Sequence, residues 1–407
     1  MNTFLTAKKA ANVLKNLTTE QKNKAITAVS GALRQNADDI ISANRLDVDE
    51  QIKKGTPDSL IDRLTLNETR ITSIASDMLS VAALPDPVNA VIDEWTAQSG
   101  IRIRKVSVPF GVIGVIYEAR PNVTVDVFTL CLKTGNACLL KGGSDAKRTN
   151  EKIVEIIRKA LSATDVPEDA VILLSSDRSS AETLIKARGY VDLIVPRGSR
   201  KLIDYVVTNS LVPVIETGAG VCHTYVSKNA NTAQALEILL NAKMSRPSVC
   251  NACETLLIDR EIAREFLKKL ADGAPSLTLH GGAEENAYLA MEPLTDSGYA
   301  TEYGNYDLSV KLVDGVREAV SHVNEYGTRH SDCICSENED EIDYFLSNVD
   351  SACVYANAST RFSDGGCFGF GAELGISTQK MHARGPMGLK EMTTYQYRIY
   401  GHGEVRK

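Results

Sequence analysis

Residues 111–215 alternate between short apolar runs and longer amphipathic stretches, and this alternation constrains the fold more than any other feature of the chain. Short apolar runs bounded by turn residues predict buried strands, while the stretches between them have the spacing of helices. Strands that alternate with helices form a parallel, doubly wound sheet with helices on both faces. The predicted strands are 111–117, 137–141, 171–174, 191–195 and 212–215, and the predicted helices are 123–134, 145–161, 179–188 and 199–208.

The regions on either side of this alternation predict further layers. Residues 3–84 carry apolar side chains at three- and four-residue spacing with charged residues between them, which predicts a layer of amphipathic helices. Strand–helix units at 254–270 and 310–326 precede predicted strands at 331–336 and 352–355. We therefore expect an α/β protein with two doubly wound domains.

Two segments outside the α/β units have the period of strands. Residues 101–108 follow the turn Ser99-Gly100 and alternate in part between apolar and polar side chains, which predicts a projecting β-hairpin. Residues 393–400 alternate in a similar way near the C-terminus. Both segments are expected to be edge strands that await partners, which suggests an oligomer, although a plain surface ribbon explains the pattern equally well.

Cys250 is the candidate nucleophile. It lies in the turn-bearing stretch 243–251, between a predicted helix and the apolar strand 255–258, where rigid elements on both sides can present a sulfur to a substrate. The attacking species is the thiolate, which Lys243 or Arg246 would stabilise if either cation folds towards the sulfur. An inert cysteine at the buried start of a strand is the alternative.

Residues 250–253 also have the C-x-x-C spacing of redox motifs and zinc sites, and Cys333 and Cys335 could complete four zinc ligands. A thioredoxin-like motif, however, opens a helix in a small βαβ domain. Zinc pairs lie on tight turns rather than in apolar runs such as 331–336. Nucleophilic catalysis is therefore the preferred interpretation of Cys250, and no metal site is expected.

Composition restricts the class of partner and the compartment. The net charge is −7 and the pI about 5.6, which argues against a nucleic-acid partner because such partners need a basic face. The nine cysteines show no disulfide framework and the N-terminus lacks a signal-peptide pattern, so a reduced, cytoplasmic protein is expected. No apolar run reaches the roughly 18 residues that a membrane-spanning helix needs.

Two loops that follow predicted strands could bind the phosphates of a ligand, which on a doubly wound sheet lies at the carboxyl ends of the strands. After strand 137–141, Lys141 can reach a phosphate or a ribose, and Ser144 is placed to cap a helix. In a later loop, Gly198 and Ser199 repeat the combination of glycine and hydroxyl at a helix start. A simple βα turn is the alternative, and the chain has no G-x-G-x-x-G.

Further polar loops complete the set of candidates. Glu216 follows strand 212–215 and could act as a general base, although a glycine-rich turn is the simpler explanation of 216–220. Residues 357–362 follow the last predicted strand. Together with the glycine-rich loop 364–369, they could hold an amino-acid head group and an anionic leaving group. The six histidines form no ligand spacing, so structural or surface positions are expected for them.

Several long motifs occur in the order found in one enzyme superfamily. Residues 109–117, 134–141, 196–199 and the cysteine loop are similar to the aldehyde dehydrogenase superfamily. Within it, the chain resembles most closely the γ-glutamyl phosphate reductases, also called glutamate-5-semialdehyde dehydrogenases. The motifs that carry this resemblance are residues 117–122 (YEARPN), 245–251 (SRPSVCN), 357–362 (NASTRF) and 381–389 (MHARGPMGL), and the likeness runs along nearly the whole chain.

The resemblance implies an aldehyde dehydrogenase-like fold and the NADPH-dependent reduction of L-glutamate 5-phosphate to L-glutamate 5-semialdehyde and phosphate, the second step of proline biosynthesis from glutamate. The Cys250 thiolate would attack the acyl phosphate, and the resulting thioester would accept hydride from the nicotinamide. The implied partners are a second copy, as a dimer or tetramer, and a functional coupling to glutamate 5-kinase. The implied domains are 1–96 with 109–221 for NADPH, 222–385 for catalysis, and 97–108 with 386–407 as an oligomerisation hairpin and arm.

The resemblance also assigns roles to residues. The Cys250 backbone N–H and the Asn122 side chain would bind the oxyanion, and Glu302 would contact the nicotinamide ribose. NADPH rather than NADH is expected because relatives that prefer NAD commonly carry a glutamate where this chain has Ser144. The remaining cofactor residues are Lys141, Gly198 and Ser199, and the substrate residues are Arg120, Arg246, Asn357, Ser359, Thr360 and Arg361.

Two other functions stay open from the sequence. An oxidising, hydrolytic aldehyde dehydrogenase would use Glu216 to activate water against the thioester, and it would oxidise varied aldehydes with NAD. A non-catalytic binding protein on the same scaffold is less consistent with the presence of Cys250 and of both anion-binding loops.

Overall fold

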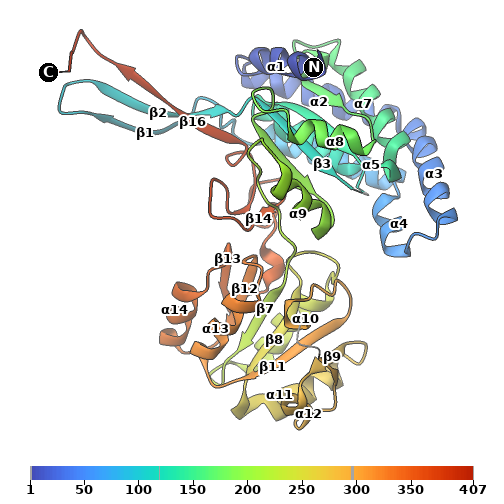
Figure 1. Ribbon diagram of the computed structural model, residues 1–407, viewed down its shortest axis with the longest axis vertical. Helices are drawn as coiled ribbons and strands as arrows, with labels where there is room; N and C mark the ends of the chain where they lie inside the picture. The colour runs from blue at the N-terminus through green and yellow to red at the C-terminus, as the bar shows by residue number, and fades with distance from the viewer. Residues whose placement is uncertain (1, 119, 295–297, 407) are drawn as a thin grey trace. The chain divides into compact units, whose positions relative to one another are not determined.

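The computed structural model describes residues 2–118, 120–294 and 298–406. The chain divides into two compact units, which Figure 1 shows. Unit 1 comprises Met1–Glu216, Gly369–Gly375 and Met387–Lys407, and unit 2 comprises Thr217–Phe368 and Ile376–Pro386. Two α/β units are as the sequence predicts, but the segment Gly369–Gly375 belongs to unit 1 rather than to the predicted catalytic domain 222–385.

Unit 1 begins with a layer of helices, as predicted for residues 3–84. The helix α2 starts at a capping box, in which the side chains of Thr18 and Gln21 satisfy each other's backbone N–H groups. Its apolar stripe of Ile26, Val29 and Leu33 is buried, which anchors the layer. The helices are α1 (Asn2–Leu14), α2 (Thr19–Gln35), α3 (Ala37–Lys53), α4 (Asp58–Leu64) and α5 (Glu68–Ala83).

A four-stranded parallel sheet follows, in the order β5-β4-β3-β6. Its strands are β3 (Val112–Tyr117), β4 (Ala137–Gly142), β5 (Val171–Leu173) and β6 (Leu193–Arg197), and its helices are α6 (Asn122–Lys133), α7 (Lys147–Leu161), α8 (Arg178–Ile185) and α9 (Arg200–Asn209). The predicted strand 212–215 is wrong as a full strand, because only an isolated bridge joins Val214 to Ile194. Pro213 has no N–H to donate, which limits the ladder at this place.

Unit 2 contains a seven-stranded sheet in the order β10-β9-β11-β8-β7-β12-β13, and every neighbouring pair is parallel. The sequence did not indicate the inner strand β7 (Cys222–Val226), because His223 and Thr224 interrupt the apolar run. The other strands are β8 (Cys253–Asp259), β9 (Thr278–Gly281), β10 (Glu292–Pro293), β11 (Asp307–Val313), β12 (Ser331–Cys335) and β13 (Cys353–Ala356). The helices are α10 (Thr232–Met244), α11 (Arg260–Gly273), α12 (Ala283–Asn286), α13 (Val316–Tyr326) and α14 (Glu339–Asn348), and β14 (Ile376–Ser377) pairs with β15 (Gly385–Pro386).

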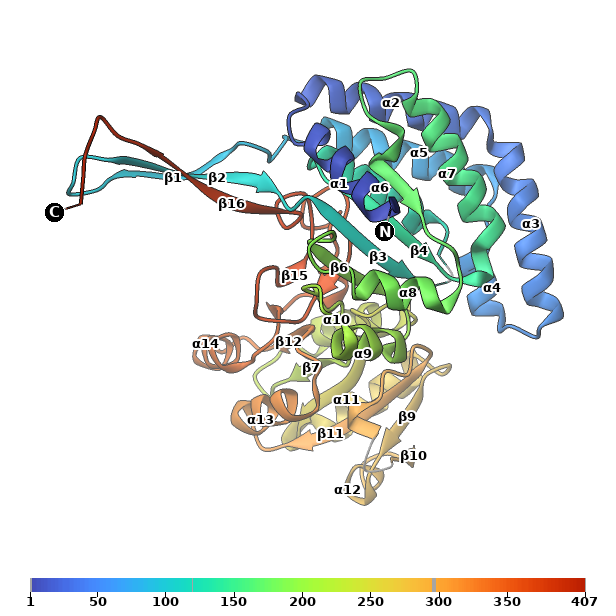
Figure 2. The same cartoon turned by 45° about the horizontal axis from the view of Figure 1, so that its top comes forward.

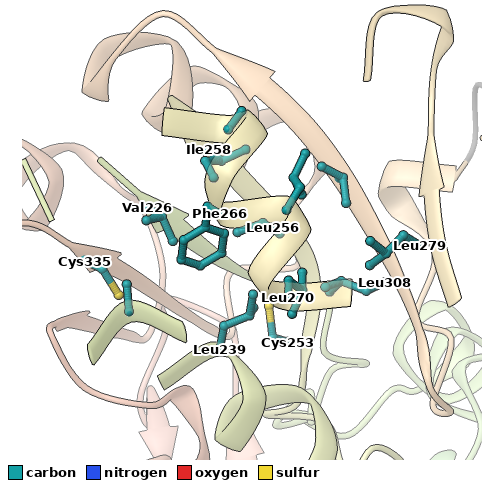
Figure 3. Packing of buried hydrophobic residues seen from close by; sticks show 14 of the residues in the cluster. Val226, Leu239, Cys253, Leu256, Ile258, Phe266, Leu270, Leu279, Leu308 and Cys335 are labelled. Carbon is teal, nitrogen blue, oxygen red and sulfur yellow. The ribbon is translucent and has the colours of Figure 1, made fainter. Parts of the chain in front are cut away.

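The core of unit 2 has two sides because alternate residues of its strands face opposite ways. Leu256 and Ile258 of β8 pack with Phe266 and Leu270 of α11, and Figure 3 shows these side chains together. Leu257, between them in sequence, packs in a second cluster with residues of α13 and α14. The sheet is therefore doubly wound, as the sequence predicts, and its strands are held rigidly from both faces.

A three-stranded antiparallel ribbon extends from unit 1 and comprises β1 (Val91–Thr96), β2 (Arg102–Pro109) and β16 (Thr393–Tyr400) (Figure 2). The sequence suggested that both 101–108 and 393–400 are edge strands that await partners. This expectation is wrong for the first segment, because β2 is the central strand and β16 pairs with it along its whole length within one chain. The open edges of the ribbon are therefore β1 and β16.

Candidate active site

Cys250 lies in the loop between α10 and β8, at the amino end of a central strand of unit 2. Its side chain is partly exposed, whereas Cys253 at the start of β8 is fully buried. Burial raises the pKa of Cys253 to about 12, so this thiol is not ionised near neutral pH. Among the described residues, no group of three or more His, Cys, Asp or Glu side chains is arranged to hold a metal ion. Of the two cysteines in the C-x-x-C, Cys250 is the one that a substrate can reach.

The backbone of Cys250 packs against the segment that leads into β7. A Cβ atom at Gly220 would lie 1.4 Å from the Cys250 carbonyl oxygen, so only glycine fits at this contact. The Cys222 thiol donates a hydrogen bond to the same carbonyl, with a sulfur–oxygen distance of 3.2 Å. Sequence reasoning missed both residues, since Gly220 has the signal of an ordinary glycine-rich turn.

A series of buried polar side chains extends from Cys222 away from this loop. Cys222 lies 3.8 Å from His330 Nδ1, and the same nitrogen lies 2.8 Å from the Ser331 hydroxyl. Ser331 and Ser363 share a hydrogen bond, and Tyr355 bonds to the Ser363 hydroxyl at 2.7 Å. Burial raises the pKa of Cys222 well above its ordinary value, with a further contribution from the charge of Asp332. Cys222 is therefore a hydrogen-bond donor in this arrangement and not a second thiolate.

Asn251 clamps the nucleophile loop to the segment around the 3₁₀ turn Thr360–Phe362. Its side-chain amide donates to the carbonyl groups of Arg361 (3.3 Å) and Ser363 (2.9 Å). In the reverse direction, the Thr360 hydroxyl donates to the Asn251 carbonyl at 2.7 Å, and the Arg361 guanidinium donates to the Asn251 side-chain oxygen. Every polar group of Asn251 named here has a partner, so the residue next to the nucleophile is held in one orientation.

The residues assigned to the substrate from 357–361 have structural partners of their own. Asn357 adopts a left-handed conformation with φ of 52° and exchanges two side-chain hydrogen bonds with the backbone of Ser336. This reversal after β13 brings Thr360 and Arg361 back to the nucleophile loop. Ser359 accepts from the Arg361 N–H at 3.3 Å, and Arg361 Nε donates to Ser245 at 3.2 Å.

The two cations expected near the sulfur have different environments. Lys243 is fully buried and pairs with Glu254 at 2.6 Å, so its charge is balanced inside the protein. Burial raises the pKa of Glu254 to about 7, against the opposing effect of Lys243. Arg246 is exposed in the nucleophile loop itself. Arg246 is thus the cation of this loop that remains available to an anionic ligand.

Glu302 precedes β11 and lies close to the nucleophile loop. Its carboxylate accepts a hydrogen bond from the Gly220 N–H at 3.1 Å, and Gly220 in turn touches Cys250. The side chain of Glu302 is otherwise exposed. Gly220 therefore links the Glu302 carboxylate to the backbone of Cys250.

In unit 1, Lys141 lies at the carboxyl end of β4, and its ammonium group donates to the Ser176 carbonyl at 2.9 Å. Burial lowers the pKa of Lys141, and the charges of Asp145, Glu118 and Asp177 oppose this shift. Ser144 is exposed and begins a short 3₁₀ helix, whose N-cap is Gly143. The prediction that Ser144 caps a helix is therefore wrong.

Arg148 does not join Lys141 as a second cation of this loop. Its guanidinium pairs with Asp47 at 3.0 Å and with Glu50 at 2.8 Å, both on α3. These pairs hold the start of α7 against the helical layer. The sequence could not reveal them, since α3 and α7 are far apart along the chain.

Gly198 and Ser199 lie between β6 and α9, at the same edge of the sheet as Lys141. Ser199 is the N-cap of α9 but makes no capping bond through its side chain. Its backbone N–H donates to the carboxylate of Glu118 at 2.9 Å. This helix start therefore binds an anion, and in this structure the anion is supplied by the chain.

Comparison with known proteins supplies the family. The aldehyde dehydrogenase family matches residues 2–306. A γ-glutamyl phosphate reductase of Kosmotoga olearia is 48% identical over 403 residues, which cover 98% of this chain and 97% of the relative. The chain belongs to the γ-glutamyl phosphate reductase family. Members of this family are oxidoreductases, and the match confirms the resemblance noted in the sequence.

Solved structures agree with this family assignment. The crystal structure of γ-glutamyl phosphate reductase from Thermotoga maritima has a TM-score of 0.97 and 44% identity, and the match covers 100% of this chain and 99% of that one. An engineered glycolyl-CoA reductase with bound NADP⁺ has a TM-score of 0.71 and 15% identity over 98% of this chain and 95% of that one. The second likeness shows the fold alone. The family match and the Thermotoga structure together confirm the predicted aldehyde dehydrogenase-like class, and the aldehyde dehydrogenase family uses a nicotinamide cofactor.

Three further candidate residues of this chain, Asn122, Arg120 and Glu216, lie in unit 1. Asn122 begins α6, and its side-chain amide donates to Asp126 at 3.0 Å. Burial raises the pKa of Asp126 to about 7, while the bond from Asn122 lowers it in part. Arg120 and Glu216 are half-buried, and Glu216 ends the first segment of unit 1.

Among the described residues, no helix is long and apolar enough to cross a membrane.

Proposed function

We propose that the protein catalyses the reduction of L-glutamate 5-phosphate to L-glutamate 5-semialdehyde and phosphate, with NADPH as the reductant and Cys250 as the nucleophile. The observation that carries the proposal is 48% identity over 98% of the chain to a γ-glutamyl phosphate reductase. The partial exposure of Cys250 and the hydrogen bonds to the carbonyl groups of Cys250 and Asn251 support its role.

In the proposed reaction, the Cys250 thiolate attacks the carbonyl carbon of the acyl phosphate. The bond from that carbon to the phosphate oxygen breaks, and a thioester remains on Cys250. The nicotinamide supplies a hydride to the thioester carbonyl. The carbon–sulfur bond of the resulting thiohemiacetal then breaks, which releases the semialdehyde and restores the thiolate.

The oxyanion formed in the attack needs hydrogen-bond donors. We assign this role to the Cys250 backbone N–H and to the Asn122 side chain. The Ala252 N–H donates to the Val249 carbonyl at 3.0 Å and the Cys222 thiol donates to the Cys250 carbonyl, so the peptide groups on both sides of Cys250 are hydrogen-bonded, which supports the first donor. Asp126 takes one N–H of the Asn122 amide and leaves the second for a ligand.

The loops of unit 1 fit a cofactor that carries phosphate groups. The start of α9 already holds a carboxylate on the Ser199 N–H, and the Lys141 ammonium group lies at the same edge of the sheet. Lys141, Ser144, Gly198 and Ser199 would hold the adenosine and phosphate groups, and Glu302 would hold the nicotinamide ribose.

The preference for NADPH over NADH is proposed to depend on Ser144. An exposed hydroxyl at this position does not repel a 2′-phosphate, whereas a carboxylate would. Ser144→Glu should therefore weaken NADPH more than NADH, by roughly 1–3 kcal/mol in the ratio of kcat/KM. Steady-state kinetics with both cofactors measures this ratio, and an unchanged ratio would show that the loop does not read the 2′-phosphate.

The anionic groups of the substrate require cations near Cys250. Arg246 is exposed in the nucleophile loop, and Arg361 contacts that loop through Ser245 and Asn251. Arg120 follows β3 in the same loop as Asn122. We assign these three residues to substrate binding, and we assign Asn357, Ser359 and Thr360 to the support of Arg361.

The ribbon of unit 1 is proposed to join copies into a homo-oligomer, a dimer or a tetramer. Its open edge strands expose large apolar side chains, which are Val91, Ile92 and Trp95 on β1 and Tyr395, Tyr397, Ile399 and Tyr400 on β16. Exposed apolar strands are a template for a second copy. Removal of residues 393–407 should shift the protein to monomer in sedimentation, and an unchanged oligomer would exclude the ribbon as the interface.

The cellular setting follows from the same proposal. An acyl phosphate hydrolyses readily, which favours a functional coupling to glutamate 5-kinase as the source of the substrate. All nine cysteines lie in the described ranges and none is disulfide-bonded, in keeping with a reducing compartment such as the cytoplasm.

The reverse reaction provides the direct test. With glutamate semialdehyde, the enzyme should reduce NADP⁺ only when phosphate is present, because phosphate must release the acyl group from Cys250. Phosphate-independent reduction would indicate a hydrolytic aldehyde dehydrogenase with a water-activating base, for which Glu216 is the candidate. An absence of turnover together with intact NADP⁺ binding would instead indicate a binding protein.

A further inference from the structure

The side chain of Glu118 lies where a phosphate of the cofactor is expected. Glu118 directly follows β3, and its backbone N–H extends the ladder to β6 by donating to the Arg197 carbonyl at 3.1 Å. This anchor directs the carboxylate to the start of α9, where it accepts the Ser199 N–H at 2.9 Å. The anion-binding group of this helix is therefore already engaged.

The contact is built closely rather than made by a loose surface side chain. A Cβ atom at Gly198 would lie 2.4 Å from the Glu118 carboxylate oxygen and 2.8 Å from a methyl group of Leu202. Glycine at 198 thus allows the carboxylate to approach the helix start. The same absence of a side chain would be needed by a phosphate at this place.

Glu118 also affects the second proposed phosphate contact. Its charge is one of three that stabilise the charged form of Lys141, together with those of Asp145 and Asp177. A carboxylate that balances Lys141 reduces the attraction of this cation for a phosphate. Both groups proposed to bind the cofactor's phosphates therefore already interact with the same carboxylate.

We propose that the Glu118 carboxylate is a built-in competitor of the cofactor's diphosphate for the start of α9. The inference rests on the proposed function, since it uses the assignment of Gly198 and Ser199 to the cofactor. Binding then requires Glu118 to leave the Ser199 N–H, and the apparent affinity is the intrinsic affinity multiplied by the fraction of molecules in which Glu118 has left. When the cofactor dissociates, the Glu118 carboxylate again accepts the Ser199 N–H, which favours the release of NADP⁺.

The test is a substitution that should improve NADPH binding because it removes a negative charge from the site. Glu118→Gln keeps the size of the side chain and removes its charge, so the dissociation constant of NADPH should fall by about 3- to 10-fold. Glu118→Asp keeps the charge but is one methylene shorter, so it reaches the Ser199 N–H less well and should also bind NADPH more tightly. Fluorescence titration of the full chain measures both constants.

A matched control removes a charge from the same helix without touching Ser199. Asp204 pairs with Arg200 on α9 at 3.1 Å and is exposed, and Asp204→Asn should leave the NADPH constant within about twofold. Inorganic pyrophosphate should compete with NADPH more strongly in Glu118→Gln than in the wild type. Thermal unfolding confirms that each variant is folded.

Three results would overturn the inference. They are an NADPH constant that is unchanged or higher in Glu118→Gln, an equal gain in Asp204→Asn, and a gain in Glu118→Gln with none in Glu118→Asp, which would reveal only a general field of charge. Failure of the proposed function looks different, because the wild type would then show no phosphate-dependent reduction of NADP⁺ with glutamate semialdehyde. That assay, run beside the titrations, separates the two failures.

Discussion

The candidate residues of the two α/β units lie at different ends of the parallel strands. In unit 1 they follow the strands, with Asn122 after β3, Lys141 at the end of β4 and Ser199 after β6. In unit 2 Gly220, Cys250 and Glu302 precede β7, β8 and β11, whereas the candidates in 357–361 follow β13. The rule that ligands lie at the carboxyl ends of strands therefore describes unit 1 and not the nucleophile of unit 2.

The difference follows from what each end can offer. Carboxyl ends of strands lead into helix starts, whose N–H groups bind anions without any particular side chain, as Ser199 does. A nucleophile instead needs a fixed position, and the amino ends in unit 2 provide one through the clamp of Asn251 and the buried chain below Cys250. This contrast is in keeping with the proposed roles, cofactor binding for the loops of unit 1 and covalent chemistry for Cys250.

The largest effect should come from the sulfur itself. Cys250→Ala should lower turnover by at least about 10³-fold while the dissociation constant of NADPH stays unchanged, because the substitution removes only the proposed covalent step. The control is Cys253→Ala, which removes a buried thiol and should have a mild effect on kcat. If both variants lost turnover equally and the protein bound zinc in stoichiometric amount, residues 250–253 would be a C-x-x-C metal site rather than the loop of a nucleophile.

The buried ion pair of unit 2 should dominate stability. Glu254→Gln leaves the Lys243 ammonium group buried without a counter-charge, which should destabilise the protein by about 3–5 kcal/mol. Urea unfolding followed by circular dichroism measures the loss. Replacing both residues, as Lys243→Met with Glu254→Gln, should recover much of it, and a double variant no better than the single one would argue against an unpaired charge as the cause.

The clamp on the nucleophile loop predicts a moderate catalytic effect. Asn251→Ala removes the hydrogen bonds to Arg361 and Ser363, so kcat and the rate of Cys250 alkylation by iodoacetamide should fall by roughly 10- to 100-fold. Asn229→Ala, at the carboxyl end of β7, is the matched control and should change neither rate. If alkylation of Cys250 kept its wild-type rate in Asn251→Ala, the clamp would not position the sulfur.

The smallest effect concerns the pH dependence of stability in unit 1. The pKa of Asp126 is raised by burial to about 7, so the folded state keeps a proton that the unfolded chain loses near its ordinary pKa of 3.8. Stability therefore falls as the pH rises between these two values and is level above about pH 7. Asp126→Asn cannot lose this proton.

Between about pH 5.5 and pH 7.5, the free energy of unfolding of the variant should rise relative to that of the wild type by on the order of 1–2 kcal/mol. The charge of Arg197 lowers the pKa of Asp126 less than burial raises it, so a neutral amide at 126 should be tolerated better than one at 254. Urea unfolding at both pH values tests this contrast. A constant difference between variant and wild type would mean that Asp126 does not titrate as its burial implies.

Local patterns were enough to predict most of the fold. The strand–helix alternation predicted the sheet of unit 1 and four strands of unit 2, because buried parallel strands need continuous apolar runs. The exceptions have local causes. His223 and Thr224 hid the inner strand β7, and Pro213 prevented the strand expected at 212–215.

The sequence by itself determined the family, the nucleophile candidate and the loops around it, since each is a short motif with its own chemical character. Only the tertiary structure decided which groups these motifs meet. Gly220, Cys222 and Ser363 come from distant parts of the chain to fix the loop of Cys250 and Asn251, and no local spacing predicts such contacts. Hydrogen bonds and charges act over a few ångströms in space, whereas motifs are read along the chain, so partners far apart in sequence become visible only once the chain is folded.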